Sequence, residues 1–101
     1  MANDKTLLAP VHPGEILHEE FMVPLSLSRN ALARSLHVPP NHVSDVVSGK
    51  RGISAVMALR LARYFGTSPD LWLGLQQDYE LDVARDNTAE RIALEVMPRA
   101  S

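Results

Sequence analysis

Short polar and cationic side chains gather in the middle of the chain, and their types suit contacts to a nucleic acid. Amides and hydroxyls such as those of Asn41 and Ser44 can bond to base edges, while cations such as Lys50 can neutralise phosphates. The candidate contact residues are Arg29, Asn30, Arg34, Pro40, Asn41, His42, Ser44, Asp45, Ser48, Lys50 and Arg51.

The distribution of charge supports this interpretation better than the total charge does. The 101 residues have a net charge of −2, which taken alone argues against a polyanionic partner. However, residues 26–63 carry six bases and one acid, whereas residues 1–25 carry four acids and one base, and residues 64–101 carry seven acids and three bases. A basic middle between acidic ends can present one face to a polyanion and another to a basic partner. The alternative is chance segregation on a solvated surface.

The elements that must position these residues are all helical. Apolar spacing, serines that begin helices and glycines that end them predict five helices. Ser28, Ser54 and Ser68 are the expected N-caps, Gly49 and Gly66 the expected C-terminal stops, and His37 a residue that tolerates positive φ. The predicted helices cover residues 13–23, 29–36, 41–47, 55–65 and 69–85.

The second and third predicted helices have the spacing of a helix-turn-helix. They are short and are separated by residues 36–39, with small residues in the first helix and Val43 and Val46 as the buried side of the second. The second helix of such a pair can enter the major groove of double-stranded DNA. Two consecutive short helices also occur in any all-α domain, so the basic charge of this region is needed to support the prediction.

Other chemistries find little support in the sequence. The chain has no cysteine, no nucleophile elbow and no glycine-rich phosphate loop, so we predict neither an enzyme nor a cofactor site. His12, His18, Glu15 and Glu19 have the donor types of a metal site, but the histidines are six residues apart and only His18 is clearly helical. We therefore expect no metal, and a solvated acidic face instead.

The chain length suits one compact domain. We expect a flexible segment over residues 1–10, the DNA-binding domain over 11–87 and a tail over 88–101. No apolar run approaches the ~20 residues of a membrane span, and the N-terminus lacks the pattern of a secretory signal. These features, together with the absence of cysteine, predict a cytoplasmic protein.

The fifth predicted helix is apolar on more than one side, which predicts a contact with a second copy of the chain. Trp72 is expected in the protomer's own core. In the tail, alternating apolar residues favour a strand, although Ala93 and Glu95 are good helix formers. The candidate residues of a homodimer interface are Tyr79, Leu81, Val83, Ile92, Leu94 and Val96.

An ordered series of motifs resembles the HigA antitoxin family within the lambda-repressor-like (XRE) helix-turn-helix domains. The resemblance spans residues 11–83. Its motifs are His12-Pro13-Gly14-Glu15-Ile16-Leu17, Phe21-Met22-Val23-Pro24-Leu25, Ser48-Gly49-Lys50-Arg51-Gly52-Ile53-Ser54, Ala58-Leu59-Arg60-Leu61-Ala62, Phe65-Gly66-Thr67-Ser68-Pro69, Trp72-Leu73-Gly74-Leu75-Gln76 and Asp78-Tyr79-Glu80-Leu81.

The resemblance implies an all-α, five-helix domain with a short C-terminal extension. It implies a homodimer that represses its own operon at a palindromic operator and neutralises a HigB-type, mRNA-cleaving toxin. By similarity, Asn41, Ser44 and Asp45 fall at base-contacting positions, and Arg29 and Lys50 at phosphate-contacting positions. Two residues depart from the family pattern. Pro40 offers only apolar contact, for example to a thymine methyl, and the anionic Asp45 could accept from cytosine, weaken non-specific binding or pair with an arginine.

Two acidic surfaces are candidates for docking the toxin, because an enzyme that cleaves RNA needs a basic surface. The first helix offers Glu15, Glu19 and Glu20, and this is the surface we favour, since the fifth helix is expected in the dimer. The end of the fifth helix offers Asp78, Glu80, Asp82 and Asp86. The alternative function is a stand-alone or phage-derived helix-turn-helix repressor, which needs the same DNA-binding dimer.

Overall fold

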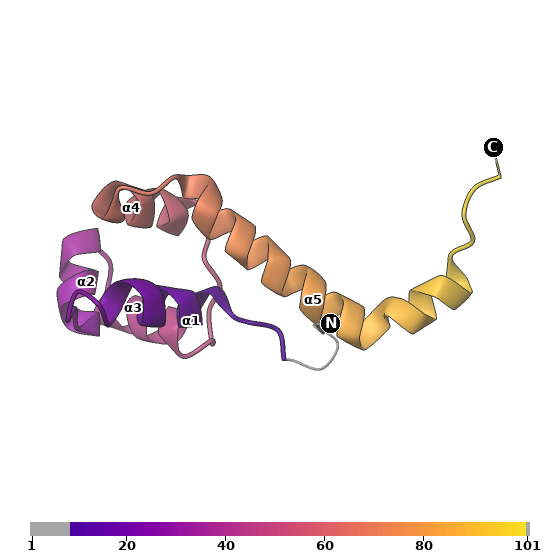
Figure 1. Ribbon diagram of the computed structural model, residues 1–101, viewed down its shortest axis with the longest axis horizontal. Helices are drawn as coiled ribbons and strands as arrows, with labels where there is room; N and C mark the ends of the chain where they lie inside the picture. Colours follow the sequence, from indigo (N-terminus) through magenta and orange to yellow (C-terminus); the bar gives the residue numbers. More distant parts are fainter. Residues whose placement is uncertain (1–8, 101) are drawn as a thin grey trace.

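The computed structural model describes residues 9–100, and most of the N-terminal segment expected to be flexible lies outside this range. The described chain is all-α (Figure 1). Its elements are α1 (Pro13–Ile16), η2 (Leu17–Met22), α2 (Arg29–Leu36), α3 (Pro40–Val47), α4 (Ala55–Phe65) and α5 (Pro69–Glu95). Because α1 and η2 follow each other without a break, these elements confirm the five predicted helices.

The first helical segment changes its winding after one turn. From Leu17 to Met22 it is a π-helix, and the Val23 amide donates to the His18 carbonyl five residues earlier, at 2.9 Å. No pattern in the sequence indicates this wider turn. The segment ends before Pro24, as expected, because proline has no amide hydrogen to continue it.

Side-chain caps fix where the other helices begin. The hydroxyls of Ser28, Ser54 and Ser68 each accept a hydrogen bond from the amide three residues later, at 3.1–3.2 Å. These contacts confirm all three predicted N-caps. At the C-termini, His37 (φ 60°) ends α2 and Gly66 (φ 75°) ends α4 in the left-handed conformation.

The core is aliphatic, with a small aromatic group at one end. Trp72 is fully buried, as predicted; its ring lies 4.8 Å from that of Phe21, and its indole N–H donates to the Thr67 hydroxyl at 2.8 Å. On α4, by contrast, Val56 and Leu59 face outward and are 61% and 59% exposed. The buried apolar residues are Leu17, Met22, Leu32, Ala33, Leu36, Val43, Val46, Ile53, Met57, Ala58, Leu61, Ala62 and Trp72.

Helix α5 is longer than the sequence predicted and replaces the strand considered for the tail. It continues past Arg85 to Glu95, and the described residues contain no strand. A strand needs a neighbouring edge for its backbone hydrogen bonds, and this fold offers none, so the helix-forming residues 93–95 decide the conformation. Within α5 the Thr88 hydroxyl donates to the Ala84 carbonyl, a contact that bends helices, and the helix bends in this region in Figure 1.

None of the helices in the described part of the chain is both long and apolar enough to cross a membrane.

The first helical segment lies directly against the back of α3. A Cβ atom placed on Gly14 would lie 1.8 Å from the Val46 carbonyl oxygen, which is far inside contact distance. Glycine is therefore required at this position, and the position of α3 depends on it.

Replacing Gly14 with alanine is expected to lower the free energy of unfolding by about 1–3 kcal/mol, because the two backbones must separate. Gly74→Ala is the matched control. Its Cβ would meet nothing within 4 Å, so a helix-favouring alanine should raise stability by about 0.5–1 kcal/mol. Denaturant unfolding of both variants tests this, and a Gly14→Ala variant as stable as the unmodified chain would contradict it.

Candidate nucleic-acid interface

Helices α2 and α3 are joined by a tight turn that sets the angle between them. The amide of His37 donates to the Arg34 carbonyl at 3.2 Å, and that of Val38 to the Ala33 carbonyl at 3.1 Å. Pro39 then takes an extended conformation and Pro40 occupies the first turn of α3, where no amide donor is needed. This is the helix-turn-helix that the sequence predicted.

Burial on one side of α3 determines which side chains face outward. Val43 and Val46 are fully buried. The polar residues lie on the remaining surface: Asn41 and Ser48 are exposed, and Ser44 and Asp45 are half-buried. Helix α3 therefore carries its candidate base contacts together on its outer side.

Cations flank this surface on both helices. Arg29, Asn30 and Arg34 are exposed on α2, and Lys50 and Arg51 are exposed just beyond α3. The loop that carries the latter pair folds back on α3, because the amides of Lys50 and Arg51 both donate to the Asp45 carbonyl, at 2.8 and 3.1 Å. The structure thus joins the predicted contacts of α3 to the basic loop that follows it.

His42 is uncharged at neutral pH. Its pKa lies below the ordinary value of 6.5, because burial disfavours the imidazolium and the nearby Arg51 acts in the same direction. The Asp45 carboxylate opposes this shift and Arg60 adds to it. A neutral imidazole offers one donor and one acceptor, so His42 suits hydrogen bonding rather than phosphate neutralisation at pH 7.

Two residues far away in the sequence hold the interface in place. The Arg60 guanidinium on α4 donates to the Leu36 carbonyl at 2.9 Å, which satisfies the end of α2. The Gln76 side chain on α5 accepts a hydrogen bond from the Ile53 amide at 2.7 Å, which ties the loop after α3 to α5. Sequence reasoning missed both residues, since neither pairing follows from local spacing.

The two histidines whose donor types could suit a metal have contacts within the fold. The Nδ1 atom of His12 accepts a hydrogen bond from the Gly14 amide at 2.9 Å, so this histidine caps α1, and its ring lies 4.8 Å from that of Tyr79. Burial lowers the pKa of His12, which keeps the ring neutral as that contact requires. His18 Nδ1 lies 3.0 Å from Glu19 Oε2.

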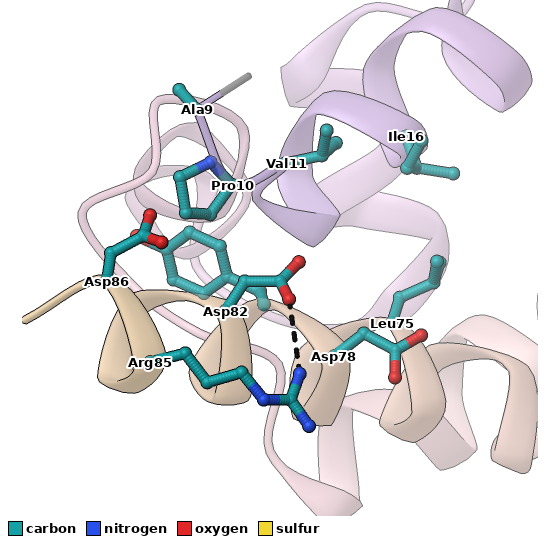
Figure 2. A pocket seen from close by; sticks show the side chains of 10 residues that line it. Ala9, Pro10, Val11, Ile16, Leu75, Asp78, Asp82, Arg85 and Asp86 are labelled. Carbon is teal, nitrogen blue, oxygen red and sulfur yellow. Dashed lines mark ion pairs between the residues drawn. The ribbon is translucent and has the colours of Figure 1, made fainter. Parts of the chain in front are cut away.

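A groove of about 440 Å³ separates the N-terminal residues 9–16 from α5. Figure 2 shows Pro10, Val11 and Ile16 on one side and Leu75 and Asp78 on the other. Asp82, which pairs with Arg85 at 3.6 Å, and Asp86 continue the acidic side of the groove along α5. Of the two predicted acidic surfaces, only the one on α5 lines this groove, through Asp78, Asp82 and Asp86.

The all-α fold, the turn and the outward polar side of α3 define the class of helix-turn-helix DNA-binding domains. Residues 19–72 match the family described as Helix-turn-helix, and the chain belongs to that family.

Individual relatives are similar over most of the chain. The structure of the Pseudomonas aeruginosa antitoxin HigA with the higBA promoter is 46% identical, with a TM-score of 0.88 over 90% of this chain and 99% of that one. Virulence-associated protein I of Dichelobacter nodosus is 46% identical over 83 residues, which cover 82% of this chain and 77% of that protein. Antitoxin HigA-1 of Vibrio cholerae serotype O1 is 35% identical over 86 residues, 85% of this chain and 81% of that protein. The HigA resemblance noted from the sequence is confirmed.

Replacing Gln76 with methionine is expected to destabilise the fold by about 1–3 kcal/mol, because the part-buried Ile53 amide loses its acceptor. Since the same loop carries Lys50 and Arg51, DNA affinity should fall as well. Gln77→Met, at the exposed neighbouring position, is the control and should change neither property. Hydrogen exchange at the Ile53 amide and a DNA titration test this, and unchanged protection of that amide would contradict it.

Proposed function

We propose that this protein is the antitoxin of a type II toxin–antitoxin pair and the repressor of its own operon. It acts in the cytoplasm as a homodimer that binds a palindromic operator in double-stranded DNA and neutralises a HigB-type, mRNA-cleaving toxin. The observation that carries this proposal is the basic helix-turn-helix surface on a chain that resembles a promoter-bound antitoxin over nearly the whole length of that antitoxin.

In the proposed complex α3 enters the major groove. Asn41 and Ser44 bond to base edges, Pro40 lies against a thymine methyl and Asp45 accepts from a cytosine amino group. Cations on the two sides contact phosphates and fix the position of the helix. The proposed phosphate contacts are the cations Arg29, Arg34, Lys50 and Arg51. The polar residues that flank them on this surface are Asn30, His42 and Ser48.

We expect binding to an inverted repeat whose half-sites lie about one helical turn, ~34–36 Å, apart. Arg29→Ala and Lys50→Ala should weaken binding to all duplexes and lower the salt slope by about one each. Asn41→Ala and Ser44→Ala should instead change the preference at one base pair by ~1–3 kcal/mol. Salt titrations on a selected operator and its scrambled version measure both effects. Equal affinity for the two duplexes at about 150 mM salt would rule out the repressor.

The homodimer is proposed because α5 carries apolar side chains that the protomer does not cover. Leu94 is 83% exposed, and Leu81, Ile92 and Val96 are also exposed. Tyr79 and Val83 are half-buried, and the Tyr79 ring is engaged with His12 inside the protomer. The C-terminal part of α5 is therefore the stronger part of the proposed interface.

The toxin is proposed to dock on the first helical segment. Glu15, Glu19 and Glu20 are all exposed. An enzyme that cleaves RNA presents cations for its substrate, and an acidic surface complements such a face. The DNA-binding side of α2 and α3 remains free in this arrangement.

Changing Glu15, Glu19 and Glu20 to lysine is expected to slow association with the product of the adjacent gene at least tenfold at low salt, through lost electrostatic steering. The matched control reverses Asp78, Glu80 and Asp86 on α5. Stopped-flow rates at low and high salt compare the two triple variants. A rate reduced only by the α5 reversal would move the docking site to α5, and no binding by the unmodified chain would favour a stand-alone repressor.

A further inference from the structure

Helix α4 has an outward surface that neither the core nor the DNA-binding side uses. Val56, Leu59 and Tyr64 are 61%, 59% and 43% exposed, although all three are large and apolar or aromatic. With the end of α2 they line a shallow depression of about 510 Å³, together with Arg60 and Arg63. We call this surface the α4 face. Its helix contains two arginines and no acid.

The C-terminal arm, residues 84–97, is a second uncovered surface. Its apolar residues Ile92, Leu94 and Met97 are 51%, 83% and 76% exposed. Residues 84–97 carry three acids and two arginines, so the arm has a net charge of −1. A short helix with exposed apolar residues gains little stability in water by itself, which indicates that another surface covers the arm.

The arm cannot reach the α4 face of its own protomer. Helix α5 is continuous to Glu95 and carries the arm away from the body, so that α4 and the C-terminus lie towards opposite ends of the molecule in Figure 1. The long axis of the protomer is 52 Å, more than twice its shortest dimension of 23 Å. The covering surface must therefore belong to another molecule.

We propose that the C-terminal arm of each protomer docks on the α4 face of its partner, in a reciprocal two-fold exchange. Charge favours this pairing, because an arm with a net charge of −1 meets a helix whose two charged residues are both arginines, whereas pairing two arms would bring segments of like net charge together. Two-fold symmetry repeats the contact, so one exchange covers both apolar surfaces of both copies. This inference rests on the proposed homodimer and specifies which surfaces form it.

Single substitutions on the α4 face test the pairing in sedimentation experiments on the full chain without DNA. Leu59→Asp should raise the dimer dissociation constant at least tenfold, while Leu25→Asp, at an equally exposed leucine elsewhere, should leave it unchanged. Both side chains point into solvent, so circular dichroism should show that each variant is folded. Truncation after Asn87 should weaken the dimer at least as much as Leu59→Asp does.

A charge exchange tests the partner of the α4 face directly. Arg63→Glu and the double variant Glu90→Lys, Glu95→Lys should each weaken self-association, whereas an equimolar mixture of the two should form a heterodimer of near wild-type affinity. Arg29→Glu, an equal charge change on α2, should not alter self-association. The affinity is restored in the mixture only if the arm of one protomer contacts the α4 face of the other.

Each contrary result has a distinct meaning. Full dimers for Leu59→Asp or for the truncated chain would overturn the proposed pairing and leave the homodimer in place. Dimerisation unchanged by Arg63→Glu, with DNA binding lost, would assign the α4 face to DNA and overturn the pairing as well. A wild-type chain that sediments as a monomer at all concentrations would overturn the homodimer itself, together with the pairing that rests on it.

Discussion

The burial of Val43 and Val46 is the constraint on which the function of this fold depends. Helix α3 contains three valines, which are poor helix formers, so its conformation relies on packing against the core and not on its own propensity. Both valines are fully buried, and the first helical segment comes so close at Gly14 that no side chain fits between them. The same contacts that make α3 a helix also direct its polar residues outward.

Contacts between distant parts of the chain then fix the surroundings of α3. Arg60 satisfies the end of α2, and Gln76 holds the loop that carries Lys50 and Arg51. These two side chains come from α4 and α5, which form the opposite layer of the domain (Figure 1). Through these two hydrogen bonds, polar side chains on α4 and α5 contribute to the shape of the proposed DNA interface.

The surface of the protomer divides by charge and by apolar exposure. Bases lie on α2, on the loop after α3 and on α4, while acids predominate on the first helical segment and along α5. The protomer is elongated, with a radius of gyration of 16.6 Å where a compact chain of this length has about 13 Å. Uncovered apolar residues occur on α4 and on the end of α5, away from α3. This division leaves separate surfaces for the proposed contacts with DNA, a second copy and a basic partner.

The sequence by itself determined where the helices begin, their serine caps and which polar residues of α3 are candidates for contacting DNA. Ser28, Ser54 and Ser68 act within one turn of their own helices, and Val43 and Val46 follow helical periodicity, so local patterns were sufficient. Only the tertiary structure decided that residues 86–95 continue α5, that Val56 and Leu59 face solvent, and that Arg60 and Gln76 support the interface. It also placed Asp78, Asp82 and Asp86 along one groove between α5 and residues 9–16. The physical reason is the separation of the interacting residues along the chain. Capping and helical periodicity depend on residues three or four apart. How the helices pack decides whether a strand has a neighbour, whether an apolar face is covered and whether hydrogen bonds form across 23 or 24 residues.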